Sequence, residues 1–427
     1  MISLQLLNQA ILESKNFDQN LSIKRDNYFD VLKEASKNKL IKAIVGFRRS
    51  GKSHLLKMLS HELQKEGVLS KNIFFLNFEN DLLNEIKTVR ELRILWEMYL
   101  VNIANPKEDI YIIWDEIQLV DKWEKLVRTL YEQGKYNIFI SGSNSKLLSG
   151  EFSTSLSGRC LEFEILPFSF MEFLEKSNIN HNNYYENREE IDIAFNLYLK
   201  RGGLPEQFDL DDDSSKKYID NIIQKILIDD IVKRYGVEKI NTLKEVFDFV
   251  KGNITSTTSL RKISERIKNQ GIKVSLATVD NYLYYWQTSY SLNKLSKFDY
   301  QLKRIFEKSN KYYCVDNLLI PGGDESDEKR LENLVYCELI RRYGRKNIYY
   351  AQNENGYEID FLVNQDNKKS FFQICYTLND GNSKREFGNL KIINNYIKGT
   401  GKLLYLNDQR TNFKENGAVS VIEWLLE

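Results

Sequence analysis

Eight consecutive residues of this chain form a pattern that is typical of phosphate binding. Positions 46 to 53 read Gly-Phe-Arg-Arg-Ser-Gly-Lys-Ser and fill every place of G-x-x-x-x-G-K-[ST]. The backbone N–H groups of such a loop, together with the helix N-terminus that follows it, form a concave anion site. Lys52 can reach the outer phosphates, and the Ser53 hydroxyl can ligate Mg²⁺. The pattern predicts a nucleoside triphosphate site, with these candidate binding residues: Gly46, Arg48, Arg49, Ser50, Gly51, Lys52, Ser53 and His54.

A pair of carboxylates further along the chain could supply the rest of the chemistry. Asp115 and Glu116 follow an apolar run that begins at Ile110. A strand here would bring Asp115 to the edge of a sheet, where its carboxylate can hold the Mg²⁺ shell. Glu116 is then the natural base to orient and deprotonate an attacking water. The alternative is an acidic loop that only closes a buried strand.

Short β-rich runs alternate with helical stretches through this part of the chain. Strands separated by helices predict an α/β fold with a mostly parallel sheet that is covered on both faces. The predicted strands are Ile41–Val45, Asn72–Phe78, Ile110–Asp115, Asn137–Ser141 and Leu161–Ile165. The predicted helices between them include His54–Lys65, Val89–Ile103 and Lys122–Gly134.

The order of these elements separates two classes of nucleotide-binding protein. One further strand, Asn72–Phe78, lies between the phosphate loop and Asp115, and a glutamate follows the aspartate. That order is the arrangement of hydrolysing AAA-type and related ATPases, and small GTP switches do not use it. The sequence therefore favours an ATPase.

A series of short motifs resembles one group of proteins over nearly the whole chain. The series comprises Ile23–Tyr28, Trp114–Gln118, Ser141–Ser143 with Lys146–Leu148, Ser155–Arg159, Leu166–Phe170 with Glu172-Phe173, and Arg201–Glu206. It is similar to that of the prokaryotic AAA-type ATPases that carry a C-terminal domain of unknown function. The resemblance implies ATP and Mg²⁺ as cofactors.

The same resemblance assigns further residues to the site. In AAA-type enzymes the end of the fourth strand carries a polar residue that senses the γ-phosphate, and Ser143 and Asn144 are the candidates here; a plain Ser/Gly turn is the alternative. These ATPases also keep an arginine where Arg159 stands. Its guanidinium could stabilise charge on the γ-phosphoryl group, in cis or from a neighbouring subunit, or it could be a solvated surface residue. A role from a neighbouring subunit would make the protein a homo-oligomer.

Bulk composition limits the other possibilities. The 427 residues allow two to four domains, and 61 basic against 60 acidic side chains give a formal charge of +1, so any nucleic-acid surface must be local. The four cysteines form no C-x-x-C pair, and three histidines leave little material for metal or triad chemistry. No secretory signal and no uncharged apolar stretch of membrane-spanning length is evident. We expect a cytoplasmic protein without membrane contact.

Patterning and resemblance to known families together divide the chain into five predicted domains. These are 1–36, an N-terminal helical extension; 37–168, a core that resembles AAA-type ATPases; 169–212, a helical lid; 213–320, a helical and winged-helix domain; and 321–427, a domain that resembles a degenerate PD-(D/E)XK nuclease. The two later boundaries follow from acidic, turn-rich stretches, Leu210–Ser215 and Pro321–Glu328.

The winged-helix prediction depends on residues Ser259 to Leu295. Apolar positions mark two helices, Gly271 marks a turn between them, and Leu292–Leu295 would begin the wing. In such modules the second helix often binds DNA. Here that helix, Ser275 to Gln287, contains no Lys or Arg and carries Asp280, so we favour packing or protein interaction over DNA reading.

The C-terminal region resembles the PD-(D/E)XK nuclease core, in which a helix Glu, a strand Asp and a Glu-x-Lys cluster hold Mg²⁺ and the attacking water. Glu332 and Asp360 match that pattern, whereas Gln373 replaces the second carboxylate and Cys375 replaces the lysine. Glu332, Asp360 and Gln373 are candidates for a second metal site. Because Cys375 supplies no cation, we expect nuclease activity to be lost, unless Lys384 or Arg385 substitutes.

The combined prediction is an ATP-binding protein whose Mg²⁺-dependent hydrolysis moves the winged-helix and nuclease-like module. Two alternatives stay open: an ATP-dependent nuclease that acts on DNA, and a nucleotide-gated signalling or scaffold protein with a protein partner.

Overall fold

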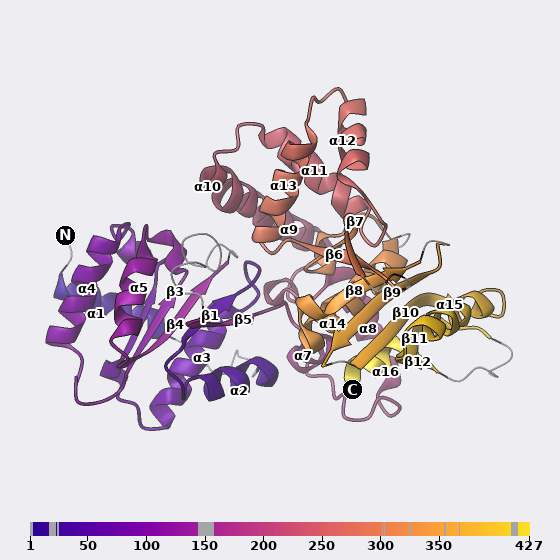
Figure 1. The fold of residues 1–427 in the computed structure, drawn as a ribbon. Coiled ribbons are helices and arrows are strands. Elements are labelled where there is room, and N and C mark those ends of the chain that lie inside the picture. Colours follow the sequence, from indigo (N-terminus) through magenta and orange to yellow (C-terminus); the bar gives the residue numbers. More distant parts are fainter. Residues whose placement is uncertain are drawn as a thin grey trace. The chain divides into compact units, whose positions relative to one another are not determined.

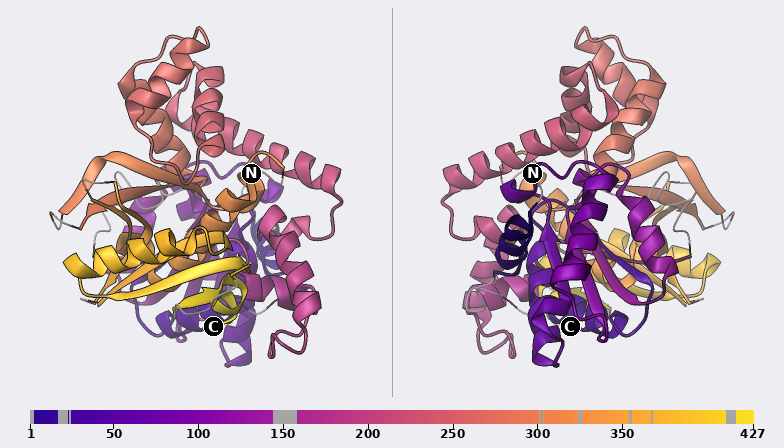
Figure 2. Two further views of the ribbon diagram at one scale, coloured as in Figure 1. Left: turned by 90° about the vertical axis from the view of Figure 1, so that its right-hand side faces the viewer. Right: turned by 90° about the vertical axis from the view of Figure 1, so that its left-hand side faces the viewer.

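The fold was analysed in a computed structural model. It describes residues 3–16, 23, 25–143, 158–300, 302, 304–323, 326–353, 356–366, 368–410 and 417–427. The chain forms two compact units, Met1–Ile165 and Leu166–Glu427, each with its own sheet. Figures 1 and 2 show the ribbon from three directions.

In the first unit, the described residues form a sheet of five parallel strands in the order β2-β3-β4-β1-β5. The strands are β1 (Ile41–Val45), β2 (Ile73–Asn77), β3 (Ile110–Asp115), β4 (Tyr136–Gly142) and β5 (Cys160–Glu164). All five predicted strands are confirmed, with ends that differ by at most one residue. Because every pair is parallel, the carboxyl ends of β1, β3 and β4 meet at one edge of the sheet.

Helices cover both faces of this sheet, as the alternation of elements predicts. They are α1 (Leu4–Lys15), α2 (Asp26–Ala35), α3 (Lys52–Lys65), α4 (Val89–Asn102) and α5 (Trp123–Glu132), with short 3₁₀ turns η2 (Ser70–Asn72), η3 (Asp81–Leu83) and η4 (Ile117–Leu119). Phe75 of β2 packs in one buried cluster with α2 and α3. Its neighbour Phe74 points to the other face and stacks on Tyr99 of α4, with ring centroids 4.1 Å apart. Alternation along a strand thus provides both cores.

The second unit begins with helices. They are α7 (Phe170–Lys176), α8 (Arg188–Arg201), α9 (Asp212–Lys225), a π-helical turn η7 (Ile226–Val232), α10 (Lys233–Tyr235), α11 (Ile240–Gly252), α12 (Leu260–Asn269) and α13 (Leu276–Thr288), with a 3₁₀ turn η6 (Pro205–Gln207). The predicted lid helices α7 and α8 pack in this unit, where the Leu199 carbonyl of α8 accepts a hydrogen bond from Asn317 (2.8 Å). In Figure 2, α11 to α13 stand together at one end of the second sheet.

The rest of this unit consists of a mixed sheet of seven described strands and the helices between them. The strand order is β12-β11-β10-β9-β8-β6-β7. The elements are β6 (Leu292–Asp299), β7 (Arg304–Cys314), η8 (Asn317–Leu319), α14 (Asp327–Tyr343), η10 (Arg345–Asn347), β8 (Ile348–Gln352), β9 (Glu358–Gln365), β10 (Lys368–Leu378), α15 (Ser383–Tyr396), β11 (Thr400–Asp408), β12 (Ala418–Ser420) and α16 (Val421–Leu426). The strand predicted to begin the wing, β6, pairs with both β7 and β8. The sheet therefore crosses the predicted boundary between 320 and 321.

Candidate functional site

The phosphate loop joins β1 to α3, as predicted, and the helix begins at Lys52. Two of its glycines have backbone angles that other residues rarely adopt, with φ +141° at Gly46 and +95° at Gly51. A Cβ atom at Gly46 would lie 2.3 Å from the Ile165 carbonyl oxygen. Glycine is therefore required at position 46 for the loop to pass the end of β5.

Lys52 is buried beneath the loop. Its ammonium donates hydrogen bonds to the carbonyl oxygens of Gly46 (3.0 Å) and Phe47 (2.9 Å), and it lies 3.8 Å from Glu116 Oε1. These partners belong to the loop that would surround a phosphate. The lysine is thus held at the predicted phosphate loop by bonds that a phosphate oxygen could replace.

Asp115 ends β3 at the same edge and is fully buried. Its Oδ1 accepts a hydrogen bond from the Ser141 hydroxyl of β4, and the same hydroxyl accepts the Glu116 backbone N–H (3.0 Å). Burial, followed by the charge of Glu116, raises the pKa of Asp115 to about 6, against the opposing influence of Ser141, Ser53 and Lys52. A nearby cation would favour the ionised carboxylate.

Glu116 follows in a left-handed backbone conformation, with φ +54°. That turn brings its carboxylate back to the sheet edge, where Oε2 accepts hydrogen bonds from the Ser143 hydroxyl (3.1 Å) and the Gln118 side chain. Burial acts to raise the pKa of Glu116, but Lys52, Gln118 and Arg48 together bring it below its ordinary value. The carboxylate is therefore ionised at neutral pH and able to accept a proton.

The remaining loop candidates have different surroundings. Arg48 is partly buried and pairs with Glu79 at the end of β2 (3.1 Å), whereas Arg49 is exposed and has φ +61°. Ser50 is buried, and His54 is half-buried on the first turn of α3. Ser143, a predicted γ-phosphate sensor, lies beside Glu116, while Asn144 lies outside the described residues.

Arg159 lies away from this site within the chain. It directly precedes β5, and β5 runs parallel to β1 with Cys160 opposite Ile41. Arg159 is therefore at the amino edge, where its carbonyl accepts the Ile41 N–H (2.9 Å) and its guanidinium lies 6.0 Å from the Tyr131 ring centroid. At about 3.3 Å per residue, roughly 16 Å of strand separates it from the phosphate loop. The predicted cis role does not fit this geometry, so a γ-phosphate contact would need a second copy of the chain.

One residue beside the loop was not predicted to belong to the site. Arg25, which precedes α2, is 3% exposed, and its guanidinium donates to the Ser50 carbonyl oxygen (2.8 Å). It also lies over the Tyr28 ring, 4.6 Å from the centroid. The motif Ile23–Tyr28 contains both residues, but nothing in its residue types indicates contact with a loop twenty positions later.

A second group of charges surrounds Lys311 on β7. Its ammonium pairs with Glu358 (2.8 Å), Glu332 (3.3 Å) and Asp360 (3.7 Å). The structure thus brings Glu332 and Asp360 together, as the nuclease resemblance implies, but around a lysine. Within the described part of the chain, no group of three or more His, Cys, Asp or Glu residues is arranged to hold a metal ion.

The third candidate for the second metal site differs from the prediction. The Gln373 side chain donates to Glu386 of α15 (3.0 Å), and Cys375 packs in the buried cluster between the sheet and α15. Arg385 pairs with Glu386 as well. The Gln373 amide thus has a carboxylate partner of its own, while its Oε1 is buried without a hydrogen-bond partner among the described residues, and the next residue, Ile374, donates its N–H to Asp360.

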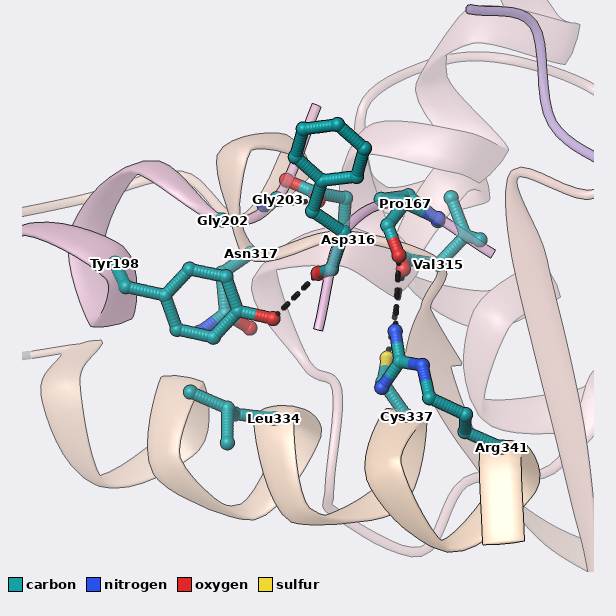
Figure 3. Close-up of a pocket in the computed structure, with 11 residues that line it drawn as sticks. Pro167, Tyr198, Gly202, Gly203, Val315, Asp316, Asn317, Leu334, Cys337 and Arg341 are labelled. Atoms are coloured by element: carbon teal, nitrogen blue, oxygen red, sulfur yellow. Dashed lines mark hydrogen bonds between the residues drawn. The ribbon is translucent and has the colours of Figure 1, made fainter. Parts of the chain in front are cut away.

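The Arg201–Glu206 motif lies beside a small cavity in the second unit, and close contacts there account for its glycines. Asp316 accepts the Gly203 N–H (2.7 Å), and a Cβ atom at Gly202 would lie 1.8 Å from its Oδ1. Arg341 donates to the Pro167 carbonyl (2.9 Å) and Tyr198 to that of Phe168 (2.7 Å), as Figure 3 shows. The cavity holds about 20 Å³, roughly one water molecule, so these contacts are structural.

The fold and the site define the first unit as an AAA-type P-loop ATPase domain, and comparison with known proteins agrees. Residues 38–174 match a family model described as an AAA domain. Residues 193–321 and 328–425 match two domains of unknown function, DUF8612 and DUF4143. The first match contains every predicted residue of the phosphate loop and the Asp-Glu pair.

Two curated relatives resemble the chain over most of its length. An uncharacterized protein of Haemophilus influenzae is 31% identical over 411 residues, which cover 95% of this chain and 99% of that protein. An uncharacterized protein of Methanocaldococcus jannaschii is 36% identical over 357 residues, covering 81% and 77%. The chain belongs to the same family as these two proteins.

Among solved structures, the Walker-type ATPase paby2304 of Pyrococcus abyssi is similar at 14% identity and a TM-score of 0.42. The likeness covers 72% of this chain and 98% of that one. A TM-score of this size is too low to support an inference. Separately, none of the helices in the described residues combines the length and apolar character that crossing a membrane requires.

Proposed function

We propose that the first unit binds ATP with Mg²⁺ and hydrolyses it. The observation that carries the proposal is the convergence of Lys52, Asp115, Glu116 and Ser143 at the carboxyl edge of one parallel sheet. In the proposed complex, the loop N–H groups and Lys52 bind the β- and γ-phosphates. Glu116 accepts a proton from the attacking water, and Ser143 orients the Glu116 carboxylate.

The residues near the loop fit a magnesium ion. Asp115 Oδ2 is buried and has no hydrogen-bond partner among the described residues, and the Ser53 hydroxyl is near enough to affect the pKa of this carboxyl. Ser53 and Asp115 would hold the ion, directly or through water. When bound, Mg²⁺ neutralises charge on the phosphate oxygens.

Phosphate release by the full chain tests the role of Glu116. Replacing it with Gln keeps the shape and the ability to accept a hydrogen bond from Ser143, but removes the base. We expect turnover to fall by about 10²-fold or more while ATP binding is retained. Glu97→Gln, an exposed position on α4, is the matched control and should leave the rate unchanged. Equal rates for the wild type and Glu116→Gln would remove Glu116 from the mechanism.

We also propose that the nucleotide cycle acts on the second unit through the connecting segment. The Ile165 N–H donates to Val45 (2.7 Å) directly before the phosphate loop, and its carbonyl is the group against Gly46. Three residues later, in the second unit, the Phe168 N–H donates to the Gly203 carbonyl (2.8 Å) and the Phe168 carbonyl accepts a hydrogen bond from the Tyr198 hydroxyl (2.7 Å). A movement of the phosphate loop would therefore be transmitted along residues 165–168, a short segment whose backbone is hydrogen-bonded at both ends.

Hydrogen exchange tests this coupling. In Glu116→Gln, which should hold ATP without splitting it, added ATP should change amide protection at Phe168 and Gly203. The same addition to Lys52→Ala, which should bind ATP about 10- to 100-fold more weakly, serves as the control at an ATP concentration that saturates only Glu116→Gln. Protection changes confined to residues before Leu166 would disprove the coupling and leave the ATPase proposal intact.

A further inference from the structure

The charged group around Lys311 is buried and joins three elements of the second unit. Lys311 lies on β7, Glu332 on α14, and Glu358 and Asp360 on β9; we refer to these four residues as the Lys311 cluster. Lys311 is 2% exposed and Asp360 is 9% exposed. A charge that is buried to this extent needs a partner of opposite sign.

Each carboxylate of the cluster faces the ammonium. Lys311 Nζ is 2.8 Å from Glu358 Oε1, 3.3 Å from Glu332 Oε1 and 3.7 Å from Asp360 Oδ1. Each carboxylate has a further donor: Tyr313 donates to the same Glu332 Oε1 that faces Lys311 (2.7 Å), the Ile374 N–H donates to Asp360 Oδ2 (2.8 Å), and the Gln352 amide donates to Glu358 Oε2 (3.2 Å). The cluster is therefore a hydrogen-bonded network around one cation.

The position of that cation has a chemical meaning. Glu332 and Asp360 are the residues that match the metal-holding helix Glu and strand Asp of the nuclease pattern. A divalent ion between them would need several more oxygen ligands, including waters, at about 2.1 Å. Lys311 Nζ instead contacts both carboxylates, with its own side chain 3% exposed and those of Asp360 and Glu332 13% and 16% exposed. An ammonium and a divalent ion at this place exclude each other by size and by charge.

We propose that the Lys311 ammonium takes the place of a divalent cation between Glu332 and Asp360, so that the second unit keeps a nuclease-like carboxylate set in a permanently metal-free form. The proposal is independent of ATP hydrolysis by the first unit.

The electrostatics of the cluster agree with this assignment. Burial alone would lower the pKa of Lys311, but the three carboxylates raise it well above the ordinary value, so the side chain stays charged. The competing interpretation is that Lys311 is the catalytic lysine of a working nuclease, supplied from a different strand.

Manganese binding to the full chain, stripped of metal and without nucleotide, tests the proposal. The wild type should bind no Mn²⁺ at the cluster, so Asp360→Asn should leave its Mn²⁺ titration unchanged. Lys311→Ala opens the position and leaves three carboxylates, and we expect it to bind one additional Mn²⁺. Lys311→Ala combined with Asp360→Asn should lose that site. Lys294→Ala, at an exposed position of β6, should behave like the wild type.

A second variant and a second readout cover the case in which Lys311→Ala folds poorly. Lys311→Met keeps the length and apolar stem of the side chain without the charge. If either variant is unfolded without metal, added Mn²⁺ should restore its thermal transition, and restoration should again need Asp360. Failure of both variants to gain Mn²⁺ by either readout overturns the proposal.

DNA cleavage separates the competing interpretation. We expect the wild type to leave single- and double-stranded DNA intact with Mg²⁺ or Mn²⁺. Metal-dependent cleavage that disappears in Lys311→Ala and in Asp360→Asn would make Lys311 a catalytic residue, and the proposal would be wrong.

Discussion

Both units bury a lysine beside carboxylates, and the two lysines are held in different ways. Lys52 in the first unit bonds to two backbone carbonyls, with Glu116 3.8 Å away. Lys311 in the second unit has three carboxylate neighbours, at 2.8 to 3.7 Å. The residue type and the degree of burial are the same, so the partners make the difference.

That difference determines which lysine is available to a ligand. A bond from an ammonium to a neutral carbonyl is weaker than one to a carboxylate, and a phosphate oxygen can replace it with a gain in energy. Lys311 is already paired with Glu332 and Glu358, and a phosphate would have to displace these carboxylates. We therefore call the Lys52 site exchangeable, because a phosphate can replace the carbonyl partners of Lys52. We call the Lys311 site permanent, because carboxylates hold Lys311.

The largest effect should come from breaking the permanent site. Lys311→Ala leaves three carboxylates around an empty position, and removing one partner from a buried ion pair costs about 3–5 kcal/mol. We expect a loss of that size in the free energy of unfolding of the second unit, measured by urea denaturation. Lys52→Ala, which loses bonds to two carbonyls and one carboxylate neighbour at 3.8 Å, should cost the first unit less, about 1–2 kcal/mol. Similar losses in both variants would contradict the comparison.

The next effect concerns the exchangeable site. In Lys52→Ala the bound phosphates lose a charged donor worth about 1.5–3 kcal/mol, which corresponds to about 10- to 100-fold weaker ATP binding. Calorimetric titration with a non-hydrolysable ATP analogue and Mg²⁺ measures it. Lys57→Ala on the same helix α3 is the matched control. Unchanged affinity in Lys52→Ala would show that the nucleotide binds elsewhere.

A third prediction uses the pH dependence of the Lys311 cluster. Burial and the charge of Glu332 raise the pKa of Asp360 to about 8, whereas an exposed aspartate titrates near about 4. Between these values the folded protein binds an extra proton, so the stability it provides is present at low pH and is lost as the pH rises toward 8. Asp360→Asn cannot ionise and should not show this loss.

Urea denaturation at a series of pH values checks the sign. Relative to the wild type, Asp360→Asn should become more stable as the pH rises from about 5 to about 8, by at most about 1.4 kcal/mol per pH unit. The amide oxygen of Asn can still accept the Ile374 N–H, which limits other changes. A stability difference that is constant with pH, or that falls, would place the Asp360 pKa below this range.

The sequence predicted the first site far better than the second. Lys52, Ser53, Asp115 and Glu116 lie in contiguous motifs at strand ends, and parallel strands bring such ends together. The same rule could have located Arg159 correctly, because it precedes its predicted strand and so belongs at the opposite edge. The position of Arg159 before the strand, readable from the sequence alone, therefore argues against the cis role.

Lys311 could not be found in the same way. It lies in the middle of a strand, 21 positions before Glu332, and it reaches the cluster only because β7 and β6 join the sheet that contains β9. That pairing depends on the register of a mixed sheet, which hydrophobic alternation does not specify across a domain boundary. Arg25 was missed for a related reason, since its contact with Ser50 joins two segments through tertiary packing alone.

The smallest predicted effect concerns Arg25, which supports the exchangeable site without belonging to the motif. Its guanidinium fixes the Ser50 carbonyl and packs 3.6 Å from the place of a Gly51 Cβ, so it holds the part of the loop that directly precedes Lys52. Arg25→Ala should loosen the loop and weaken ATP binding by about two- to tenfold, since only part of a net hydrogen-bond energy is transmitted to the ligand. Arg25→Lys, which keeps a charge but loses the planar stack on Tyr28, should be intermediate. Calorimetric titration of ATP compares both with Lys57→Ala, and an Arg25→Ala effect as large as that of Lys52→Ala would indicate that Arg25 itself touches the nucleotide.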